Sequence, residues 1–280
     1  MEWRLIREEL YDGSMAMAYD EVAAETVAAG GPATVRLYRW LPSTLTLGYG
    51  TDASVVDWAF CEERNIHVTR RPTGGGAIYH DTSGDVAYSI IAPAEAFSSN
   101  VTDCYRELLE PVLAAFDEVG VDVDFAAETR DALWEPACYL RALDPAHDLV
   151  CGGRKIAGNA QYRTRDAVVQ HGSLTFETNA EKHLGCFVDP PVSADEFERR
   201  VGGLVEALAY DDTVETSVGA MGGYDLQRSQ FVRALEESLA EWADATESEW
   251  SDEERERAKE IAGGKYRTDE WVRERTDPLA

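Results

Sequence analysis

The sequence is poor in lysine. Only Lys155, Lys182, Lys259 and Lys265 occur among 280 residues, and arginine supplies the rest of the 26 basic side chains. Because 53 residues are acidic, the formal net charge is −27 at pH 7. A chain of this charge will not bind nucleic acid or an anionic membrane through its overall field. An acidic, lysine-poor surface is typical of a cytosol with very high salt, where charges are strongly screened, and we interpret it as a halophilic adaptation to the solvent.

Several other features are missing. The five cysteines form no CxxC pair, and cysteine and histidine show no metal-ligand spacing, which predicts reduced thiols and no metal site. The first residues, MEWRLIREELYDG, lack the apolar core of a signal peptide. No run of about 18 apolar residues occurs, so no membrane span is expected. These absences together predict a cytoplasmic protein.

The order of the expected elements favours an α+β fold. Helices are predicted at 15–29 and 100–120, the second with Pro111 kinking or splitting it. The expected strands are 2–8 (an edge strand), 35–40, 44–49, 66–71 and 85–93, with two or three more between 121 and 177. Strands thus cluster before and after one long helix, instead of alternating with helices as in a doubly wound sheet.

The C-terminal third is expected to be helical. Amphipathic patterns predict helices at 193–209 and 226–243, and a further helix after residue 251 that stops at Gly263-Gly264. No Pro/Gly/Ser-rich linker precedes this part, so we expect it to pack on the rest of the chain. Of the four lysines, Lys155 alone lies in a patterned, half-buried segment, and the other three are expected to face solvent.

The densest motif is RRPTGGGAIYHD, residues 70–81. Three consecutive glycines permit positive φ and a close approach of a ligand to the backbone. The two arginines ahead of them carry donor forks that suit a carboxylate or a phosphate. The motif indicates a small anionic ligand, although on its own a glycine-rich loop with surface arginines explains it equally well.

A second motif, GGRKIAGNAQYR at 152–163, precedes VVQHGSLTF at 168–176. A hairpin can bring Lys155, Asn159 and His171 near one face. The lysine ammonium would there be a point charge for a carboxylate and an α-phosphate during acyl-adenylate chemistry. The alternative is a structural hairpin with Lys155 on the surface and His171 in the core.

These motifs resemble those of the lipoate–protein ligase and octanoyl transferase family. RRPTGGGAIYHD is similar to its RRxxGGGxVxHD signature, GGRKIAGNAQYR to GKKxxGxAxxR, and VVQHGSLTF to the HGxLL strand. The resemblance implies a mixed-sheet α+β catalytic domain, shared with biotin–protein ligases, over residues 1–190. Residues 191–280 would then be a helical extension packed on it.

The resemblance also implies a site. Lys155 would hold the acyl carbonyl and phosphate oxygens. The remaining wall would comprise Arg71, Gly74, Gly75, Gly76, Ala77, His80, Gly158, Asn159, Ala160, His171 and Gly172. The activity implied is attachment of a lipoyl or octanoyl group to one lysine of a carrier domain. The implied partners are the lipoyl domain of a 2-oxoacid dehydrogenase E2 or the glycine-cleavage H protein, with a separate accessory protein as a further possibility.

Two mechanisms and one non-enzymatic role remain open. In a ligase, which the third glycine favours and which we place first, ATP and Mg²⁺ convert lipoate or octanoate to an acyl-adenylate. In a transferase, Cys138, 17 residues before Lys155, would accept the acyl group as a thioester without ATP; Gln161 favours this branch. Cys138 could instead be a small buried hydrophobe. The third hypothesis is a non-catalytic protein that binds a cofactor or a lipoyl domain.

Overall fold

The computed structural model describes residues 1–209 and 221–280. Its centre is an eight-stranded sheet in the order β11-β1-β2-β6-β10-β9-β8-β7. The strands are β1 (Trp3–Tyr11), β2 (Ala33–Trp40), β6 (Asp85–Pro93), β7 (Asp124–Phe125), β8 (Leu149–Cys151), β9 (Arg154–Arg163), β10 (Ala167–Thr175) and β11 (Thr246–Glu247). β1 runs parallel to β2 and β11, whereas the other neighbours are antiparallel. The mixed sheet confirms the α+β prediction.

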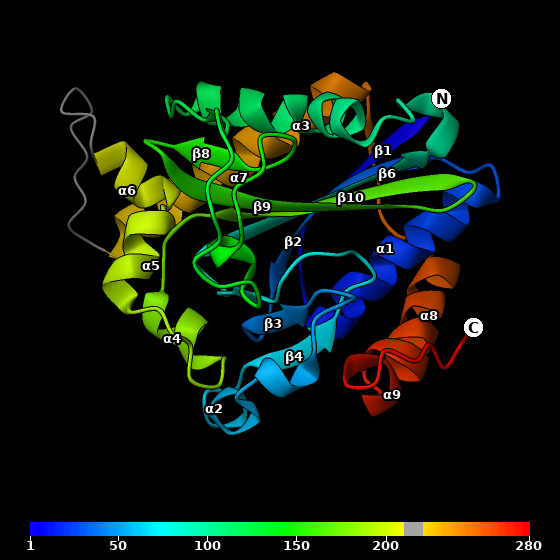
Figure 1. The fold of residues 1–280 in the computed structure, drawn as a ribbon. Helices are drawn as coiled ribbons and strands as arrows, with labels where there is room; N and C mark the ends of the chain where they lie inside the picture. Colours follow the sequence, from blue (N-terminus) through cyan, green and yellow to red (C-terminus); the bar gives the residue numbers. More distant parts are fainter. Residues whose placement is uncertain (210–220) are drawn as a thin grey trace.

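Helices cover both faces of this sheet (Figure 1). α1 (Gly13–Ala28) packs on one face, and α3 (Val101–Glu118) lies with α7 (Met221–Ala243) on the other. Each face therefore has its own hydrophobic cluster, one built around α1 and one around α3 and α7. Strands buried on both faces become apolar along most of their length, so the polar residues of the fully buried β10 mark places where the core is interrupted.

A smaller sheet lies on the same side as α1 (Figure 1). It consists of β3 (Thr44–Leu47), β4 (His67–Arg70) and β5 (Ile78–His80), in the order β4-β3-β5. α2 (Trp58–Glu63), preceded by the short turn η1 (Ala53–Val55), leads into β4. The glycines of the first motif connect β4 to β5, so this sheet positions the glycine loop opposite the large sheet.

The remaining helices are short. They are α4 (Ala180–Gly185), α5 (Ala194–Arg200), α6 (Leu204–Ala209), α8 (Asp252–Ile261) and α9 (Asp269–Val272), with 3-10 turns η2 (Ala94–Ala96) and η3 (Cys138–Leu140) and a π-helical turn η4 (Ala262–Tyr266). α8 packs against α1. None of the described helices is both long and apolar enough to cross a membrane. The domain boundary at residue 190 stays a prediction.

Several local predictions were wrong. The helix expected at 193–209 breaks at 201–203, because Gly202 and Gly203 pack closely against Arg154 and the backbone of Phe176. Helical turns continue past Gly263-Gly264 through η4. β1 is not an edge strand, since β11 pairs with it.

Two expectations concerned single side chains. Lys265 does not face solvent: it is buried, and its ammonium contacts Glu21 and Asp277 at 2.5 and 2.8 Å. Pro111 does not split α3, which is continuous from 101 to 118. Pro111 is buried inside this helix.

The buried guanidinium of Arg70 ties three distant segments together. It donates to five backbone carbonyls, those of Gly48, Tyr49, Thr51, Trp271 and Val272. In return the indole N–H of Trp271 donates to the carbonyl of Arg70 at 2.8 Å. The end of β4, the turn after β3 and the C-terminal α9 therefore depend on one side chain.

We predict that Arg70→Met lowers the free energy of unfolding by about 3 kcal/mol or more, because several buried carbonyls lose their donors at once. Urea denaturation at constant salt concentration measures the change. The matched control is Arg165→Met, at an exposed position, which should change the value by less than about 0.5 kcal/mol. Equal effects of the two substitutions would contradict the role given to Arg70.

Candidate active site

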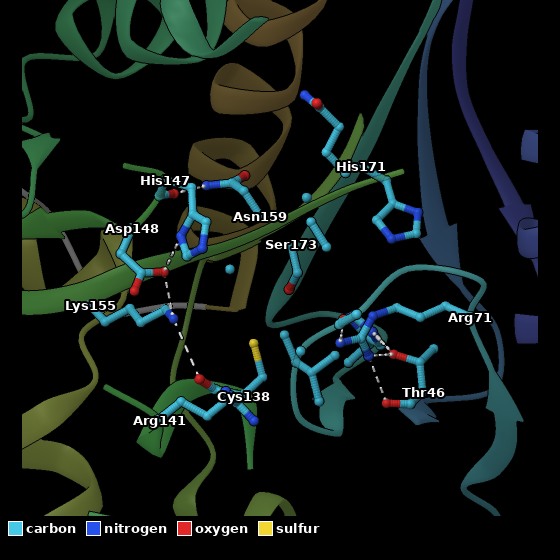
Figure 2. A pocket seen from close by; sticks show the side chains of 18 of the residues that line it. Thr46, Arg71, Cys138, Arg141, His147, Asp148, Lys155, Asn159, His171 and Ser173 are labelled. Atoms are coloured by element: carbon cyan, nitrogen blue, oxygen red, sulfur yellow. Dashed lines mark hydrogen bonds and ion pairs between the residues drawn. The ribbon is translucent and has the colours of Figure 1, made fainter. Parts of the chain in front are cut away.

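A cavity of about 260 Å³ opens between the two sheets. Figure 2 shows its side chains, which come from β3, the glycine loop, η3, β9 and β10. Eleven of the thirteen residues predicted from the sequence line it: Arg71, Gly74, Gly75, His80, Cys138, Lys155, Gly158, Asn159, Ala160, His171 and Gly172. Gly76 and Ala77 are buried behind the wall and do not line the cavity.

The Arg71 guanidinium binds backbone carbonyl oxygens of the glycine loop. Arg71, 5% exposed, donates to the carbonyls of Gly74 and Gly76 at 2.8 and 2.7 Å and to the carbonyl of Thr46 at 3.0 Å. The carbonyl of Gly75 accepts from the Thr51 hydroxyl at 3.2 Å. The interpretation of Arg70 as a fork for an anion was wrong, because Arg70 lies outside the cavity. Arg71 lines the cavity, where its guanidinium is hydrogen-bonded to the loop itself, and its role in ligand binding stays a prediction.

The glycine loop also carries backbone N–H groups that are not hydrogen-bonded to acceptors in the described part of the chain. Its three carbonyls are held by protein donors, but among the described residues the N–H groups of Gly75 and Gly76 have no acceptor. Gly75 has φ of +89°, which only glycine adopts readily. Backbone N–H groups fixed in this way beside a cavity are suited to stabilising negative charge on an oxygen atom.

Gly76 is required by a close backbone contact. A Cβ atom there would lie 2.7 Å from the carbonyl oxygen of Pro136 and 2.8 Å from the amide nitrogen of Cys138. The next residue, Ala77, exchanges backbone hydrogen bonds with this segment: its N–H donates to Pro136 and its carbonyl accepts from Cys138, both at 2.7 Å. The glycine loop therefore fixes the backbone of Cys138.

Cys138 begins the short turn η3 and is partly exposed in the cavity. A Cβ atom at Gly158 would lie 3.4 Å from its sulfur, so the thiol points at the bare backbone of β9. Figure 2 shows the sulfur turned into the cavity beside Lys155. A thiol in this position can meet a substrate carbonyl between the glycine loop and β9.

Lys155 is the cation beside the thiol. Its side chain, 4% exposed, contacts Oδ1 of Asp148 at 2.7 Å and donates to the carbonyl of Cys138 at 3.4 Å. Burial alone would raise the pKa of Asp148, but the charge of Lys155, with help from His147, prevails and lowers it to about 2. The pair is therefore a buried ammonium and carboxylate at neutral pH.

Two histidines on the cavity wall, His171 and His80, contact protein partners through both ring nitrogens. His171 bonds Thr73 at 2.8 Å and Asp20 at 3.0 Å. Asp20 also contacts the buried guanidinium of Arg36 at 2.9 Å. Burial of Asp20 opposes its ionisation, but the charge of Arg36 outweighs this effect and keeps the pKa below its usual value.

His80 is similarly fixed, between Thr46 at 3.0 Å and Asp85 at 2.7 Å, and burial lowers its pKa. Its ring stacks on Trp40 with centroids 4.1 Å apart. Because the nitrogens of His80 and His171 are committed to protein partners, these two residues shape the wall and do not exchange protons with a ligand.

The sequence analysis missed several polar residues of the site, among them His147, Asp148 and Ser173 on the cavity wall and Asp20 and Asp85 behind its histidines. For Asp20 a signal existed, since a carboxylate three and four residues after Met17 and Ala16 falls on the buried face of its helix. His147 and Asp148 formed a second signal, as a histidine and a carboxylate just ahead of the apolar LVC strand. Asp85 and Ser173 gave no pattern, because their partners come from other strands.

Comparison with known proteins adds two findings. A model of the lipoyl protein ligase A/B catalytic domain matches residues 12–222. The octanoyltransferase LipM of an Exiguobacterium species is 31% identical over 280 residues, covering 96% of this chain and 97% of its own. The LipM of Kyrpidia tusciae is also 31% identical, with the same coverage.

Two solved structures that are similar over nearly the whole chain are ligases. Lipoate-protein ligase A bound with ATP superposes with a TM-score of 0.73 at 24% identity, over 98% of this chain and 99% of that one. The bipartite lipoate protein ligase of Thermoplasma acidophilum gives 0.72 at 24% identity, over 98% and 96%. At this identity the likeness establishes the fold.

We predict that Gly76→Ala destabilises the protein by about 2 kcal/mol, because the new methyl group overlaps backbone atoms that cannot easily move. Thermal and urea unfolding measure the loss. Gly74→Ala is the matched control: its Cβ would meet nothing within 4 Å, so the change should stay below about 0.5 kcal/mol. A Gly76→Ala variant as stable as the control would contradict the close contact with Cys138.

We predict that Asp148→Asn makes the free energy of unfolding less dependent on pH between about pH 4 and pH 2. The folded pKa of Asp148 is about 2, below its ordinary 3.8, so its ionisation stabilises the fold above pH 4 by about 2 kcal/mol, and this contribution disappears as the pH falls toward 2. The difference between wild type and variant, measured by urea unfolding, should therefore shrink over this range. A difference that stays constant from pH 7 to pH 2.5 would argue against the ion pair.

Proposed function

Because the chain belongs to the lipoyl protein ligase A/B catalytic domain family, we propose that it is an octanoyltransferase. It would move an octanoyl group from a thioester donor to a lysine of a lipoyl carrier domain, through a thioester on Cys138. The adenylate-forming ligase, placed first in the sequence analysis, becomes the competing mechanism. Either way, the chain is an enzyme of lipoyl or octanoyl transfer.

The observation that carries this proposal is the position of the Cys138 thiol. It lies in the cavity, facing Gly158, beside the Lys155 ammonium and next to the glycine loop. A ligase does not require a protein thiol at this place, because its nucleophiles are the substrate carboxylate and the acceptor amine. The relatives that are similar over nearly the whole chain are named octanoyltransferases, which supports the same choice.

The size and charge of the cavity also favour an octanoyltransferase over a ligase. Its volume of about 260 Å³ is small beside the roughly 300–1,000 Å³ of most ligand sites, and it suits a slender acyl chain better than a chain plus a nucleotide. Asp148 is the one carboxylate among the described lining residues, and Lys155 already occupies it. These residues do not fit a Mg²⁺–ATP complex, so no step is assigned to one.

Apolar side chains would receive the acyl chain. Met17, Tyr38, Trp40 and Ile78 line the cavity. Burying eight carbons against them would yield about 0.8 kcal/mol for each methylene group. The carbonyl end would then remain near the thiol and the glycine loop.

In the first half-reaction, the sulfur of Cys138 attacks the carbonyl carbon of the donor thioester. A new C–S bond forms, the C–S bond to the donor breaks, and the proton of the Cys138 thiol leaves with the donor thiol. Negative charge develops on the carbonyl oxygen, where the Lys155 ammonium and the amide of Gly75 can stabilise it.

In the second half-reaction, the acceptor lysine attacks the Cys138 thioester. A C–N bond forms, the C–S bond breaks, and the thiol of Cys138 is restored. The oxyanion passes through the same position in both halves, so one set of donors serves both. The proposed acceptors are the lipoyl domain of a 2-oxoacid dehydrogenase E2 or the glycine-cleavage H protein.

We predict that the enzyme, incubated with octanoyl acyl carrier protein and no ATP, gains one octanoyl group on Cys138, detected by mass spectrometry. Cys138→Ser should lose transfer to an apo lipoyl domain by at least 100-fold, because a serine hydroxyl ionises far less readily than a thiol. Cys151→Ser, outside the cavity, is the control and should retain activity. Full activity of Cys138→Ser with strict dependence on ATP would establish the ligase instead.

A further inference from the structure

The second half-reaction requires a proton acceptor that the proposed function leaves unassigned. The acceptor lysine arrives as an ammonium, since its ordinary pKa is about 10.4. It must lose one proton to become a nucleophile and a second when the amide forms. The Cys138 thiolate takes one of these, so another group must take the other.

Lys155 is a poor candidate for this role. Its ammonium is buried and held by Asp148 at 2.7 Å, and an ammonium has no lone pair to accept a proton. The guanidinium of Arg71 is occupied by the glycine loop and stays charged. Both act as electrostatic groups only.

Four of the five histidines are also unavailable. His80 and His171 have protein partners on both ring nitrogens. His67 and His183 do not line the cavity; His67 bonds Ser14 at 3.0 Å, and His183 is buried against a separate small cavity, where burial lowers its pKa to about 3.

His147 is placed differently. It lines the cavity, its side chain is 30% exposed, and its Nδ1 lies 3.4 Å from Oδ1 of Asp148. That oxygen is the same atom that Lys155 contacts. No described residue binds the Nε2 atom, which is therefore open to a ligand. Figure 2 shows the ring above Lys155 and Cys138, on the cavity side of Asp148.

Three contacts hold His147 in this orientation. Its backbone carbonyl accepts from the Asn159 side chain at 3.0 Å. The ring of Tyr105, on α3, packs edge-to-face against it with centroids 5.0 Å apart. The Asp148 carboxylate lies 3.4 Å from Nδ1, as an ion-pair contact and not as a hydrogen bond. A histidine ring held in place with its Nε2 atom open to the cavity can accept a proton from a ligand there.

We propose that His147 is a catalytic base of the second half-reaction, with Asp148 as its positioning residue. Neutral His147 takes a proton from the acceptor ammonium at Nε2, the free amine attacks the Cys138 thioester, and the C–N bond forms as the C–S bond breaks. The second amine proton goes to the Cys138 thiolate, and His147 releases its proton to solvent. This inference rests on the proposed thioester mechanism.

The charged groups around His147 set its pH dependence. Asp148, Lys155 and Arg141 are the charged side chains that line the cavity with it. Tyr105 and Cys138 are the other titratable groups on the cavity wall nearby. Transfer should increase with pH, because only the neutral imidazole can accept a proton.

The test separates the two half-reactions in His147→Gln. Thioester formation on Cys138 from octanoyl acyl carrier protein should stay within about threefold of wild type. Transfer from the preformed thioester to an apo lipoyl domain should fall by about 100-fold or more, as for loss of a general base, and should lose its rise with pH. Hydroxylamine, which is neutral near pH 7 and needs no base, should cleave the thioester of both proteins at similar rates.

His67→Gln is the matched control, since His67 lies outside the cavity, and both half-reactions should keep their wild-type rates. The inference is overturned if His147→Gln transfers to the lipoyl domain at the wild-type rate, or if it slows hydroxylamine cleavage and thioester formation as much as transfer. If wild type forms no thioester at all, the proposed function itself fails, and the failure is visible before the variant is compared.

Discussion

Two adjacent buried arginines bind backbone carbonyl oxygens in the glycine loop and in the segments around the small sheet, and the rest of the cavity depends on this arrangement. Arg71 binds the carbonyls of Gly74 and Gly76, which leaves the N–H group of Gly75, on the cavity wall, for a ligand. Arg70 binds α9 and the turn after β3, which closes the small sheet. The loop in turn fixes Cys138 through the backbone of Ala77. Segments about 200 residues apart in the chain therefore determine where one sulfur atom lies.

Charged side chains are paired in the interior, whereas the surface carries an excess of carboxylates. With a net charge of −27, exposed carboxylates repel one another, and salt screens this repulsion over about 8–10 Å at moderate ionic strength. Buried charges are screened much less, and here they are paired: Lys155 with Asp148, Arg36 with Asp20, and Lys265 with Glu21. The electrostatics of the cavity therefore change little with salt concentration.

The sequence predicted the α+β class and assembled most of the cavity from two motifs, because each motif is local: a glycine loop after a strand, and a lysine just after a tight turn. It could not predict the partners of Asp85 or Ser173, since strand order and register decide them. It misjudged Arg70 for a related reason. A guanidinium binds a backbone carbonyl as readily as an anion, and only the fold shows which acceptor is nearer. Lys265 was misjudged because its acidic partners come from α1 and the C-terminus.

The choice between ligase and transferase depends on how much positive charge the cavity keeps for a substrate. A nucleotide would bring several negative charges and would need several cations that are not already engaged. Arg71 is committed to the glycine loop, Lys155 shares its charge with Asp148, and Arg141 contacts Glu135 at 3.1 Å at the partly exposed rim. A thioester is neutral, and its transition state develops one oxyanion, for which one ammonium and a backbone amide suffice. The same fold can serve both chemistries, but the pairing of these three cations suits the thioester.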